Sequence, residues 1–541
     1  MRKILFVMSV LILTTVLSSY AFESFEEYLK MQQAEYENYL EEIDREFTAF
    51  LKQTWKEYEG EEPIELLEEP KPVDIPVAVP EKKPEPIKIT PKPKPKPVIL
   101  KEKPVSKPEP KPEPVKDEPV VDSPKPAPAP VKEEPVKKEP VKKEPVVKAP
   151  EPEEPVVQEP VVVAPTPEPQ YVPKQEAKGL ALSFYGRELD IPVDNALKAY
   201  AKRPLSSKHI ADWWEAVAVT DYKKTLKYFK KTSVDMKLGD WCYVNLVERF
   251  AAKLMGDVAE RKLLVWFFMN KGGYDTKLGY TKEGVVKVMV PTDKELYGVT
   301  YYTFSGKRYY VIDVFGKVDK VESLYTYKGS YPDARNELVL SKMQNPKLGF
   351  NGFARDLKFN FDGKDYKIQA IANKFDIAYL NNFPQADLAV YTGAQAPEWI
   401  DQTILPELKK IIEGKNPREA VNIILRFVQT AFEYKTDDVQ FGKEKFLFAE
   451  ETVYYPYSDC EDRSVLFAYL VGKLLKLDMI MLDFPGHIAV AVDLGKYNTG
   501  AVVGYKGKSF SVTDPTYINA TAGMVMPQYK DTSPEIIEPE I

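Results

Sequence analysis

Proline is concentrated in one part of this chain, and this concentration limits how much of the chain can fold. Residues 63–173 hold 32 of the 47 prolines in a chain of 541 residues. Up to residue 170 this tract contains no Gly, Phe, Trp, Tyr, Cys, Met or His. A segment without aromatic side chains buries too little apolar area to offset the entropy lost on ordering. We therefore expect residues 61–176 to form a disordered spacer rich in Pro, Lys and Glu.

The spacer alternates Lys-Pro and Glu-Pro, as in residues 91–97. Such a sequence favours polyproline II and acts as a semi-rigid connection. At roughly 3.1 Å per residue it reaches at most on the order of 340 Å. In composition it resembles the spacer of TonB-type proteins that cross a periplasm, and a plain linker without a partner is the open alternative.

Charge excludes one class of partner. The net charge is −7, and residues 63–173 hold 19 Lys against 21 Asp and Glu. Acidic and basic residues are interspersed throughout, and no basic domain stands out. We therefore expect no nucleic-acid partner.

The first residues have the pattern of an export signal. Arg2 and Lys3 precede an apolar run over residues 4–17, and Ser19 and Ala21 are small residues before a cleavage point. Residues 1–21 are therefore expected to be a signal peptide that sends the chain to the periplasm of the bacterial envelope or outside the cell. An uncleaved membrane anchor is the alternative.

An amphipathic helix is expected over residues 22–58, within a segment 22–60. Its apolar residues recur mostly at steps of three and four: Phe25, Leu29, Tyr36, Leu40, Ile43, Phe47 and Phe50. An isolated helix of this kind needs a partner for its apolar stripe. A self-associating coiled coil, docking on the body of the chain, and contact with another envelope protein all satisfy that need.

The remainder predicts an α+β protein in several parts. We expect an α/β domain at 177–316, a β-rich segment at 317–396, a mixed domain at 397–530 and an acidic tail at 531–541. Helical periodicity occupies residues 241–254, 399–413 and 417–432, and strand alternation occupies 285–290, 298–304 and 308–314. Asp362-Gly363 marks a turn inside the β-rich segment.

Cysteine and histidine are scarce, which narrows the chemistry. Cys242 and Cys460 are either bridged or include a working thiol. Any mechanism that needs imidazole must use His209 or His487, the two histidines of the chain. His209 has no acid or thiol pattern around it and is expected on the surface.

His487 belongs to a set that fits thiol catalysis. Cys460 precedes a helical run, His487 follows Gly486 at the start of an apolar strand, and Asp514 ends a strand before Pro515. A helix N-terminus and a nearby imidazolium both lower the pKa of a thiol, and an acid orients the imidazole. The pattern predicts Cys460 as nucleophile, His487 as general base and Asp514 as its orienting group.

The acids beside the thiol oppose this chemistry. Asp459, Glu461 and Asp462 would raise the pKa of Cys460 unless their charges are compensated. Asp459 could cap the helix while Asp462 reaches back to backbone donors. Alternatively, Asp459 and Glu461 could hold a Ca²⁺ ion.

These residues carry a family resemblance. The strings are Ser458-Asp459-Cys460-Glu461-Asp462-Arg463-Ser464, then Gly486-His487, then Thr513-Asp514-Pro515-Thr516. They resemble the transglutaminase-like superfamily of papain-fold thiol enzymes, and in particular exported bacterial transglutaminase-like cysteine peptidases whose acids beside the Cys bind calcium. The resemblance implies a papain-like C-terminal domain and the three roles given above for Cys460, His487 and Asp514.

The resemblance also implies a reaction class. Members are peptidases, cross-linking transferases or amidases, so acyl transfer at an amide of a protein or peptide substrate is expected, with no required cofactor and calcium as an option. Ile488 departs from the family, where an aromatic often follows the His. Gln440 and Tyr455 are candidate oxyanion donors. A catalytically inactive relative that serves as an envelope adaptor is the alternative.

An earlier part of the chain has a similar pattern. Asp240-Trp241-Cys242 opens a helix, residues 284–290 match 486–492, and residues 304–313 match 505–514. We therefore expect a diverged copy of the same fold within 177–316. It keeps a Cys and Asp313, but Val285 replaces His487, so the copy could not perform the same chemistry.

Overall fold

The protein is of the α+β class, and its computed structural model describes residues 25–53, 55–64, 75–78, 179–315 and 323–539. The expected signal peptide and most of the expected spacer lie outside these residues. Among the described helices, none combines the length and the apolar character that crossing a membrane requires.

The first half of the fold packs helices on one face of an antiparallel sheet. Its helices are α2 (Phe25–Leu51), α3 (Ser207–Ala218), α4 (Tyr222–Asp235), α5 (Asp240–Leu254) and α6 (Val258–Gly272). Its sheet has the order β1-β8-β4-β5-β7-β6, with bounds β1 (Lys56–Glu59), β4 (Lys277–Tyr280), β5 (Val286–Val290), β6 (Tyr301–Phe304), β7 (Lys307–Ile312) and β8 (Ser323–Thr326). A separate hairpin consists of β2 (Leu180–Phe184) and β3 (Arg187–Ile191), followed by a short 3₁₀ helix at Asn195–Leu197.

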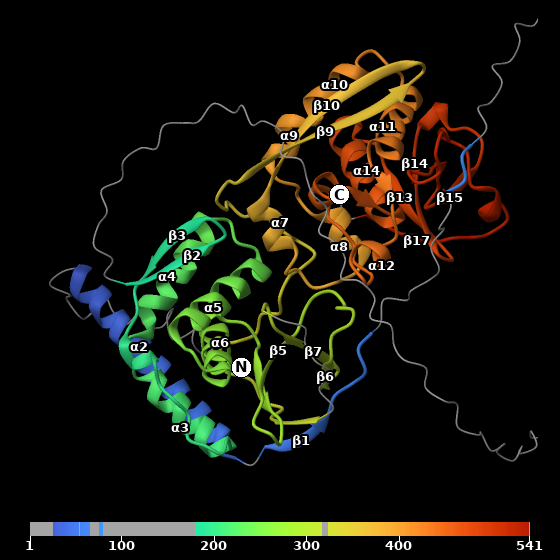
Figure 1. The fold of residues 1–541 in the computed structure, drawn as a ribbon. Coiled ribbons are helices and arrows are strands. Elements are labelled where there is room, and N and C mark those ends of the chain that lie inside the picture. Colours follow the sequence, from blue (N-terminus) through green and yellow to red (C-terminus); the bar gives the residue numbers. More distant parts are fainter. Residues whose placement is uncertain (1–24, 54, 65–74, 79–178, 316–322, 540–541) are drawn as a thin grey trace, which may run out of the picture. The chain divides into compact units, whose positions relative to one another are not determined.

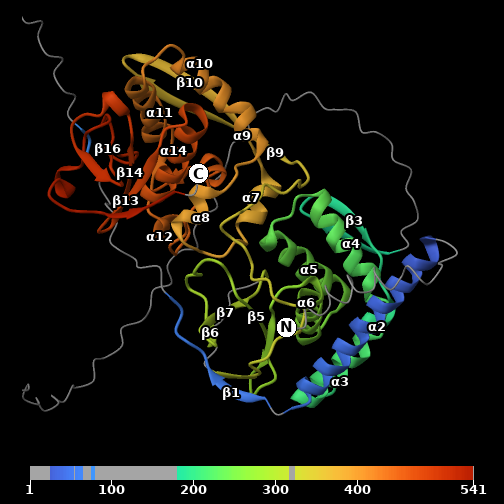
Figure 2. The same cartoon turned by 180° about the vertical axis from the view of Figure 1, so that it is seen from behind.

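Helix α2 lies along α3 in both views of the ribbon (Figures 1 and 2). Its apolar stripe buries Ile43, Phe47 and Leu51. The Phe47 ring centroid is 4.9 Å from that of Trp214 and 5.2 Å from that of Tyr331. Of the arrangements that the sequence left open for this stripe, docking on the body of the chain is the one present in the structure.

The N-terminal helix is shorter than its sequence pattern predicts. It ends at Leu51, and Lys56–Glu59 form strand β1, antiparallel to β8. The main-chain hydrogen bonds of the sheet outweigh the weak local helix preference of these residues. The chain continues along the same sheet, where the Glu61 amide donates to the Tyr301 carbonyl at 2.9 Å.

The middle of the chain is less β-rich than expected. It contributes one long hairpin, β9 (Gly352–Phe361) with β10 (Lys364–Asn373), which lies against α11 (Pro417–Ala431) (Figure 1). Asp362 and Gly363 form its turn with φ of 52° and 79°, as the Asp-Gly pair predicts. The helices that follow are α7 (Lys374–Leu380), α8 (Leu388–Gly393), α9 (Glu398–Thr403) and α10 (Leu405–Ile412). Strand β8 belongs to the first sheet.

The C-terminal part repeats the helix-on-sheet arrangement. Its helices after α11 are α12 (Asp437–Gln440), α13 (Ala449–Tyr454) and α14 (Cys460–Leu475). Its sheet has the order β15-β16-β14-β13-β17, with bounds β13 (Met479–Phe484), β14 (His487–Val492), β15 (Val502–Tyr505), β16 (Lys508–Thr513) and β17 (Glu535–Ile537). Strands β11 (Glu433–Tyr434) and β12 (Tyr457–Ser458) form a short parallel pair, and 3₁₀ turns occupy Gly495–Tyr497 and Pro527–Tyr529. All six residues of β14 are buried because α14 covers this strand.

The two sheets share one strand order. The series β4-β5-β7-β6 has the same neighbours and antiparallel pairing as β13-β14-β16-β15. Both final hairpins turn through a left-handed residue and a glycine, Ser305-Gly306 in one and Lys506-Gly507 in the other. In each half the helix that directly precedes the first of these strands packs on the sheet, α6 in one and α14 in the other.

Docking of α2 can be tested by stability. Phe47→Ala removes a buried aromatic ring, so the free energy of unfolding should fall by about 3–5 kcal/mol, measured by urea denaturation. Tyr36→Ala, which truncates an exposed ring on the same helix, is the matched control and should change stability by less than about 0.5 kcal/mol. Equal effects of the two substitutions would contradict the docking.

Candidate functional site

Cys460 is the first residue of α14, and its side chain is fully buried. Buried Arg463 fixes this helix start: Nε donates to Ser458 Oγ at 3.2 Å, and the two terminal nitrogens donate to the carbonyls of Gln429 and Phe432 at 3.3 and 2.8 Å. Burial lowers the pKa of Arg463 to about 10, so it remains a cation at neutral pH. The predicted nucleophile therefore lies at a helix N-terminus, where the helix dipole favours a thiolate.

His487 and Asp514 form a buried pair on adjacent strands. Gly486, with φ of 70°, turns the chain into β14, and β16 ends one residue before Asp514. His487 Nε2 and Asp514 Oδ2 are 2.9 Å apart. Within the described structure His487 Nδ1 is buried without a hydrogen-bond partner. The carboxylate thus takes one ring nitrogen and leaves the other for a reacting group, as a catalytic His requires.

The structure brings the start of α14 next to the start of β14. Ser464, one turn after Cys460, donates from Oγ to the carbonyl of Ile488 at 3.2 Å. The Cys460 thiol donates to Glu461 Oε2 at 3.0 Å, and the Glu461 charge acts on the imidazole of His487. The predicted nucleophile and base therefore share one buried site, in which Glu461 holds the thiol.

A residue that sequence reasoning missed holds the loop after Asp514. The Nε2 of buried Gln429, on α11, lies within hydrogen-bond distance of three carbonyls, those of Asp514, Tyr517 and Ala520, at 3.0, 2.7 and 3.2 Å. Asp514 Oδ1 in turn accepts from the amides of Thr516 and Tyr517 at 2.9 and 3.0 Å. A glutamine inside a helix gives no signal for this role, because its partners are 85 to 91 residues away in the chain.

The acids around Cys460 fall into two overlapping groups. Carboxylate oxygens of Glu444, Asp459 and Glu461 lie within 4.8 Å of one another, as do those of Asp437, Asp459 and Asp462. Carboxylates on opposite sides of a Ca²⁺ ion, each about 2.4 Å from it, are separated by a similar distance. The donors are all hard oxygens and mostly buried, so these residues fit calcium.

Asp462 also meets backbone donors, as the capping explanation predicts. Its Oδ2 accepts from the amide of Asp459 at 3.3 Å, and its Oδ1 accepts from the amide of Leu447 at 2.9 Å. This compensates the charge of Asp462 without an ion. The neighbouring cation Lys445 bonds Glu451 at 2.5 Å, so it neutralises a different acid.

The two oxyanion candidates lie near one another, because Phe441, which follows Gln440, packs its ring on Tyr455 with centroids 5.2 Å apart. Gln440 ends α12, the helix whose first residue is Asp437, and its Oε1 is buried without a hydrogen-bond partner among the described residues. Tyr455 directs its hydroxyl to Asn381 Oδ1 at 2.9 Å. Burial raises the pKa of Tyr455, so it is a neutral donor.

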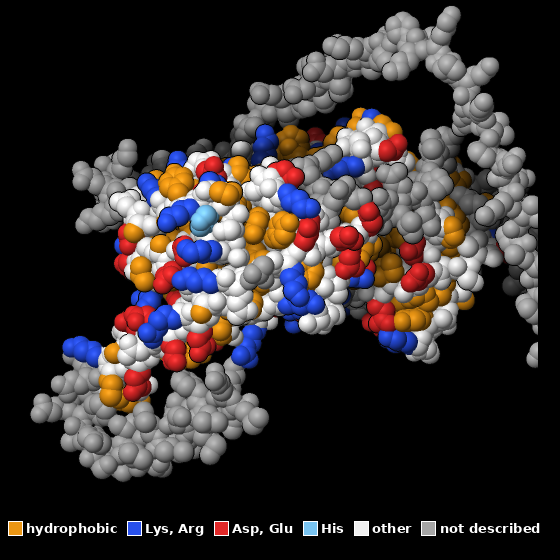
Figure 3. All heavy atoms as spheres, turned by 90° about the horizontal axis from the view of Figure 1, so that it is seen from below, with side chains coloured by type: hydrophobic (Ala, Val, Ile, Leu, Met, Phe, Trp, Pro, Cys, Tyr) orange, Lys and Arg blue, Asp and Glu red, His pale blue; other side chains and the backbone are white. Residues whose placement is uncertain are grey.

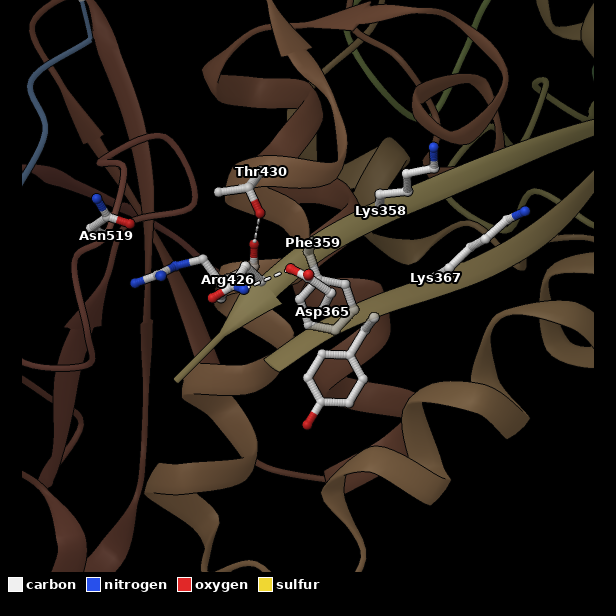
Figure 4. A pocket seen from close by; sticks show the side chains of 9 residues that line it. Lys358, Phe359, Asp365, Lys367, Arg426, Thr430 and Asn519 are labelled. Carbon is white, nitrogen blue, oxygen red and sulfur yellow. Dashed lines mark hydrogen bonds between the residues drawn. The ribbon is translucent and has the colours of Figure 1, made fainter. Parts of the chain in front are cut away.

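A pocket of about 610 Å³ opens on the other side of the loop that Gln429 holds. Figure 4 shows Arg426 and Thr430 of α11 facing Phe359 and Asp365 of the β9–β10 hairpin, with Asn519 beyond Arg426. Arg426 Nε donates to Gln429 Oε1 at 3.2 Å, which connects the pocket to the loop.

Charge on the surface is mixed. On the face drawn in Figure 3, acidic and basic side chains lie among one another without an extended basic area. This agrees with the absence of a basic domain from the sequence.

The counterpart site in the first half is built differently from the sequence expectation. In the first half α6 is the equivalent of α14, because both helices cover their sheet. The N-cap of α6 is Asp257, so its first residue, Val258, takes the place of Cys460. Cys242 lies on α5, which packs beside α6 as α11 packs beside α14. The assignment of Cys242 as the equivalent of Cys460 was therefore wrong: Asp240-Trp241-Cys242 opens a helix, but not the one that covers the sheet.

An ion-pair network fills this counterpart site. Lys262 Nζ lies 2.6 Å from Glu248 Oε1 and 3.3 Å from Asp313 Oδ2. Asp313, the counterpart of Asp514, thus pairs with a lysine where Asp514 pairs with an imidazole. Val285 is half exposed and takes the place of His487, as the sequence predicts.

The remaining cysteine and histidine have no catalytic surroundings. Cys242 and Cys460 are not joined by a disulfide, so the bridged alternative is not the arrangement present. Burial raises the pKa of Cys242 far above its usual range. His209 Nδ1 lies 2.7 Å from the carbonyl of Pro204 on the exposed start of α3.

Scans of this chain against protein-family models, curated proteins and solved structures return no match. The likeness to transglutaminase-like enzymes therefore depends on the motifs and on the geometry described above.

Titration of His487 tests the His-Asp pair. Burial works to lower the pKa of this imidazole, but the charge of Asp514 and the hydrogen bond to it more than offset that effect and leave the pKa raised. Asp514→Asn keeps an acceptor for the two backbone amides and removes the charge, so the pKa of His487 should fall below its ordinary value of about 6.5. NMR of the imidazole protons over a range of pH measures this pKa. The His209→Gln substitution removes the other histidine, so that the remaining imidazole signal belongs to His487.

The same pair makes stability depend on pH. A raised folded-state pKa means that the pair stabilises the fold fully below the unfolded pKa of about 6.5. This contribution is lost as pH rises through the raised folded pKa of His487. If the pKa of His487 in Asp514→Asn is the same as in the parent, the His487–Asp514 pair is contradicted.

Proposed function

We propose that this chain is an exported thiol enzyme of the transglutaminase-like class, which attacks amide bonds of protein or peptide substrates. The observation that carries the proposal is the buried His487–Asp514 pair, whose unpaired Nδ1 lies at the start of the central strand β14, beside a helix that begins with Cys460. Order along the chain, helix start and strand positions all agree with the motif resemblance. Cysteine peptidase and glutamine acyltransferase or amidase are the two variants of this activity.

The proposed reaction uses three side chains. His487 Nδ1 takes the thiol proton, and the thiolate of Cys460 attacks the amide carbon to form a C–S bond. Asp514 on Nε2 stabilises the resulting imidazolium, which then gives its proton to the leaving amine as the C–N bond breaks. Water or an amine attacks the thioester with His487 as base, which gives hydrolysis or transfer and restores the thiol.

The thiol must leave Glu461 for this reaction, and calcium would favour that. Asp459, Glu461 and Glu444 would hold the ion, and the chemistry it supplies is neutralisation of charges that oppose a thiolate. With their charges compensated, the helix N-terminus and imidazolium act on Cys460 without opposition.

A second candidate is a catalytically inactive envelope adaptor. The hydrogen bond from Cys460 to Glu461 and the complete burial of the triad favour it. In this reading the first half, in which Val258 and Val285 stand at the positions of Cys460 and His487, is a diverged copy that already lacks the chemistry. We include that copy in both proposals, on the shared strand order and helix placement.

Thiol labelling separates the two candidates. Iodoacetamide should modify Cys460 in the native protein, and His487→Ala should slow this reaction by about tenfold or more, since the thiolate fraction falls. Mass spectrometry gives the modification of each cysteine separately. Cys242, in the core of the first half, is an internal reference that reacts only when the fold opens.

Two results would decide for the adaptor. One is a Cys460 that reacts no faster than Cys242. The other is a Cys460 whose reaction does not depend on His487.

Calcium has a test that does not need activity. Saturating Ca²⁺ should raise the melting temperature, by an amount equivalent to about 2.7 kcal/mol at 100 times the dissociation constant. Chelation should reverse the effect, and Glu444→Gln should reduce it. Glu407→Gln, which alters an exposed acid on α10, is the matched control. A melting temperature that is the same with calcium and with chelator would exclude the ion.

A further inference from the structure

A short segment of the chain lies beside the triad although it is about 440 residues away in sequence. The amide of Ala78 donates to the carbonyl of Ile518 at 2.8 Å, and Val77 forms a parallel β-bridge with Ile518. The segment 75–78 belongs to the start of the Pro-rich tract, whose described part is thus not a free spacer. It is held by main-chain pairing, which an extended peptide of varied sequence can use.

The surface under this segment is apolar and selects side chains by size. Ala78 is buried in a cluster with Tyr517, Ala520 and Met526. The side chain of Val77 is 61% exposed. Side chains of an extended segment alternate between faces. The surface therefore accepts a small apolar residue at the position of Ala78 and tolerates variety at that of Val77.

Two walls of this surface touch the triad directly. The amide of Tyr517 donates to Asp514 Oδ1. The ring of Tyr529, which also packs on the cluster, stacks on the imidazole of His487 with centroids 5.1 Å apart and planes 12° apart. A peptide seated here therefore lies against the groups that orient the base.

We propose that the surface formed by Tyr517, Ile518, Ala520, Met526 and Tyr529 is a binding site for extended peptide segments with a small apolar residue, and that residues 75–78 are its resident occupant. The role of this site in substrate binding rests on the proposed thiol-enzyme function. The resident segment competes with peptide substrate, and its departure loosens Tyr529 and gives access to Cys460.

The test uses the full chain and two neighbouring substitutions. Ala78→Glu places a charge in the buried position, whereas Val77→Glu places the same charge in the exposed position. In the parent and in Val77→Glu, the Ala78 or neighbouring amides should be protected from hydrogen exchange. In Ala78→Glu this protection should fall by about tenfold, equivalent to about 1.4 kcal/mol of opening free energy. Ile75→Asp, which alters a different contact of the segment, should act like Ala78→Glu.

Binding of a free peptide is the second measurement. A synthetic peptide with the sequence of residues 73–80 should bind Ala78→Glu at least about tenfold more tightly than the parent, because the site is vacated. The same peptide with Glu in place of the Ala should not bind. Equal exchange of residues 75–78 in all variants, or equal binding of the peptide to parent and variant, overturns the proposal.

The rate at which iodoacetamide modifies Cys460 distinguishes failure of the peptide-site proposal from failure of the thiol-enzyme proposal. If the site is vacated in Ala78→Glu and Cys460 then reacts faster than in Val77→Glu, both proposals are supported. If exchange and peptide binding change as expected while Cys460 stays unreactive, the peptide site is supported and the thiol-enzyme function is refuted.

Discussion

The loop from Asp514 to Ala520 is the constraint on which the rest of the site depends. The Gln429 amide holds its carbonyls, and the Asp514 carboxylate holds its amides, so the loop is tied from both sides. Buried polar groups that are hydrogen-bonded to one another rigidify a structure, since losing one partner strands the others. The orientation of His487, the position of Ile518 and one wall of the pocket at Arg426 all follow from this one buried network.

The negative charge around Cys460 is the second constraint on the site. Five acids make up the two overlapping carboxylate clusters near Cys460. Arg463 is a buried cation on α14, and it donates to a hydroxyl and to backbone carbonyls rather than to these acids. Backbone donors meet the charge of Asp462, and Glu444, Asp459 and Glu461 place three further carboxylates close to the thiol. A thiol in such a place is a weak nucleophile until a cation or a conformational change removes that charge. The proposed attack by the Cys460 thiolate therefore requires that the negative charge around the thiol is first compensated or moved away.

Much of the fold could be predicted from sequence because it depends on local signals. The periodicity of α11 and α14, the glycine before His487 and the proline after Asp514 mark elements that the structure contains. Long-range pairing carried no such signal. Strand β1, the Gln429 clamp and the docking of Ala78 depend on residues far apart in sequence. The same limit explains the error at Cys242: a helix start is visible locally, but which helix covers the sheet is decided by packing.

The two halves show how one arrangement supports different chemistry. In each half, the helix that covers the sheet begins near the end of a strand that an aspartate directly follows. This aspartate is Asp313 after β7 in the first half and Asp514 after β16 in the second. In the first half Lys262 forms ion pairs with that aspartate and with Glu248. In the second half Ser464 occupies the lysine position and leaves room for the imidazole of His487, which can gain or lose a proton near neutral pH. The two halves therefore differ in the group that pairs with this aspartate, which is a lysine in the first half and an imidazole in the second.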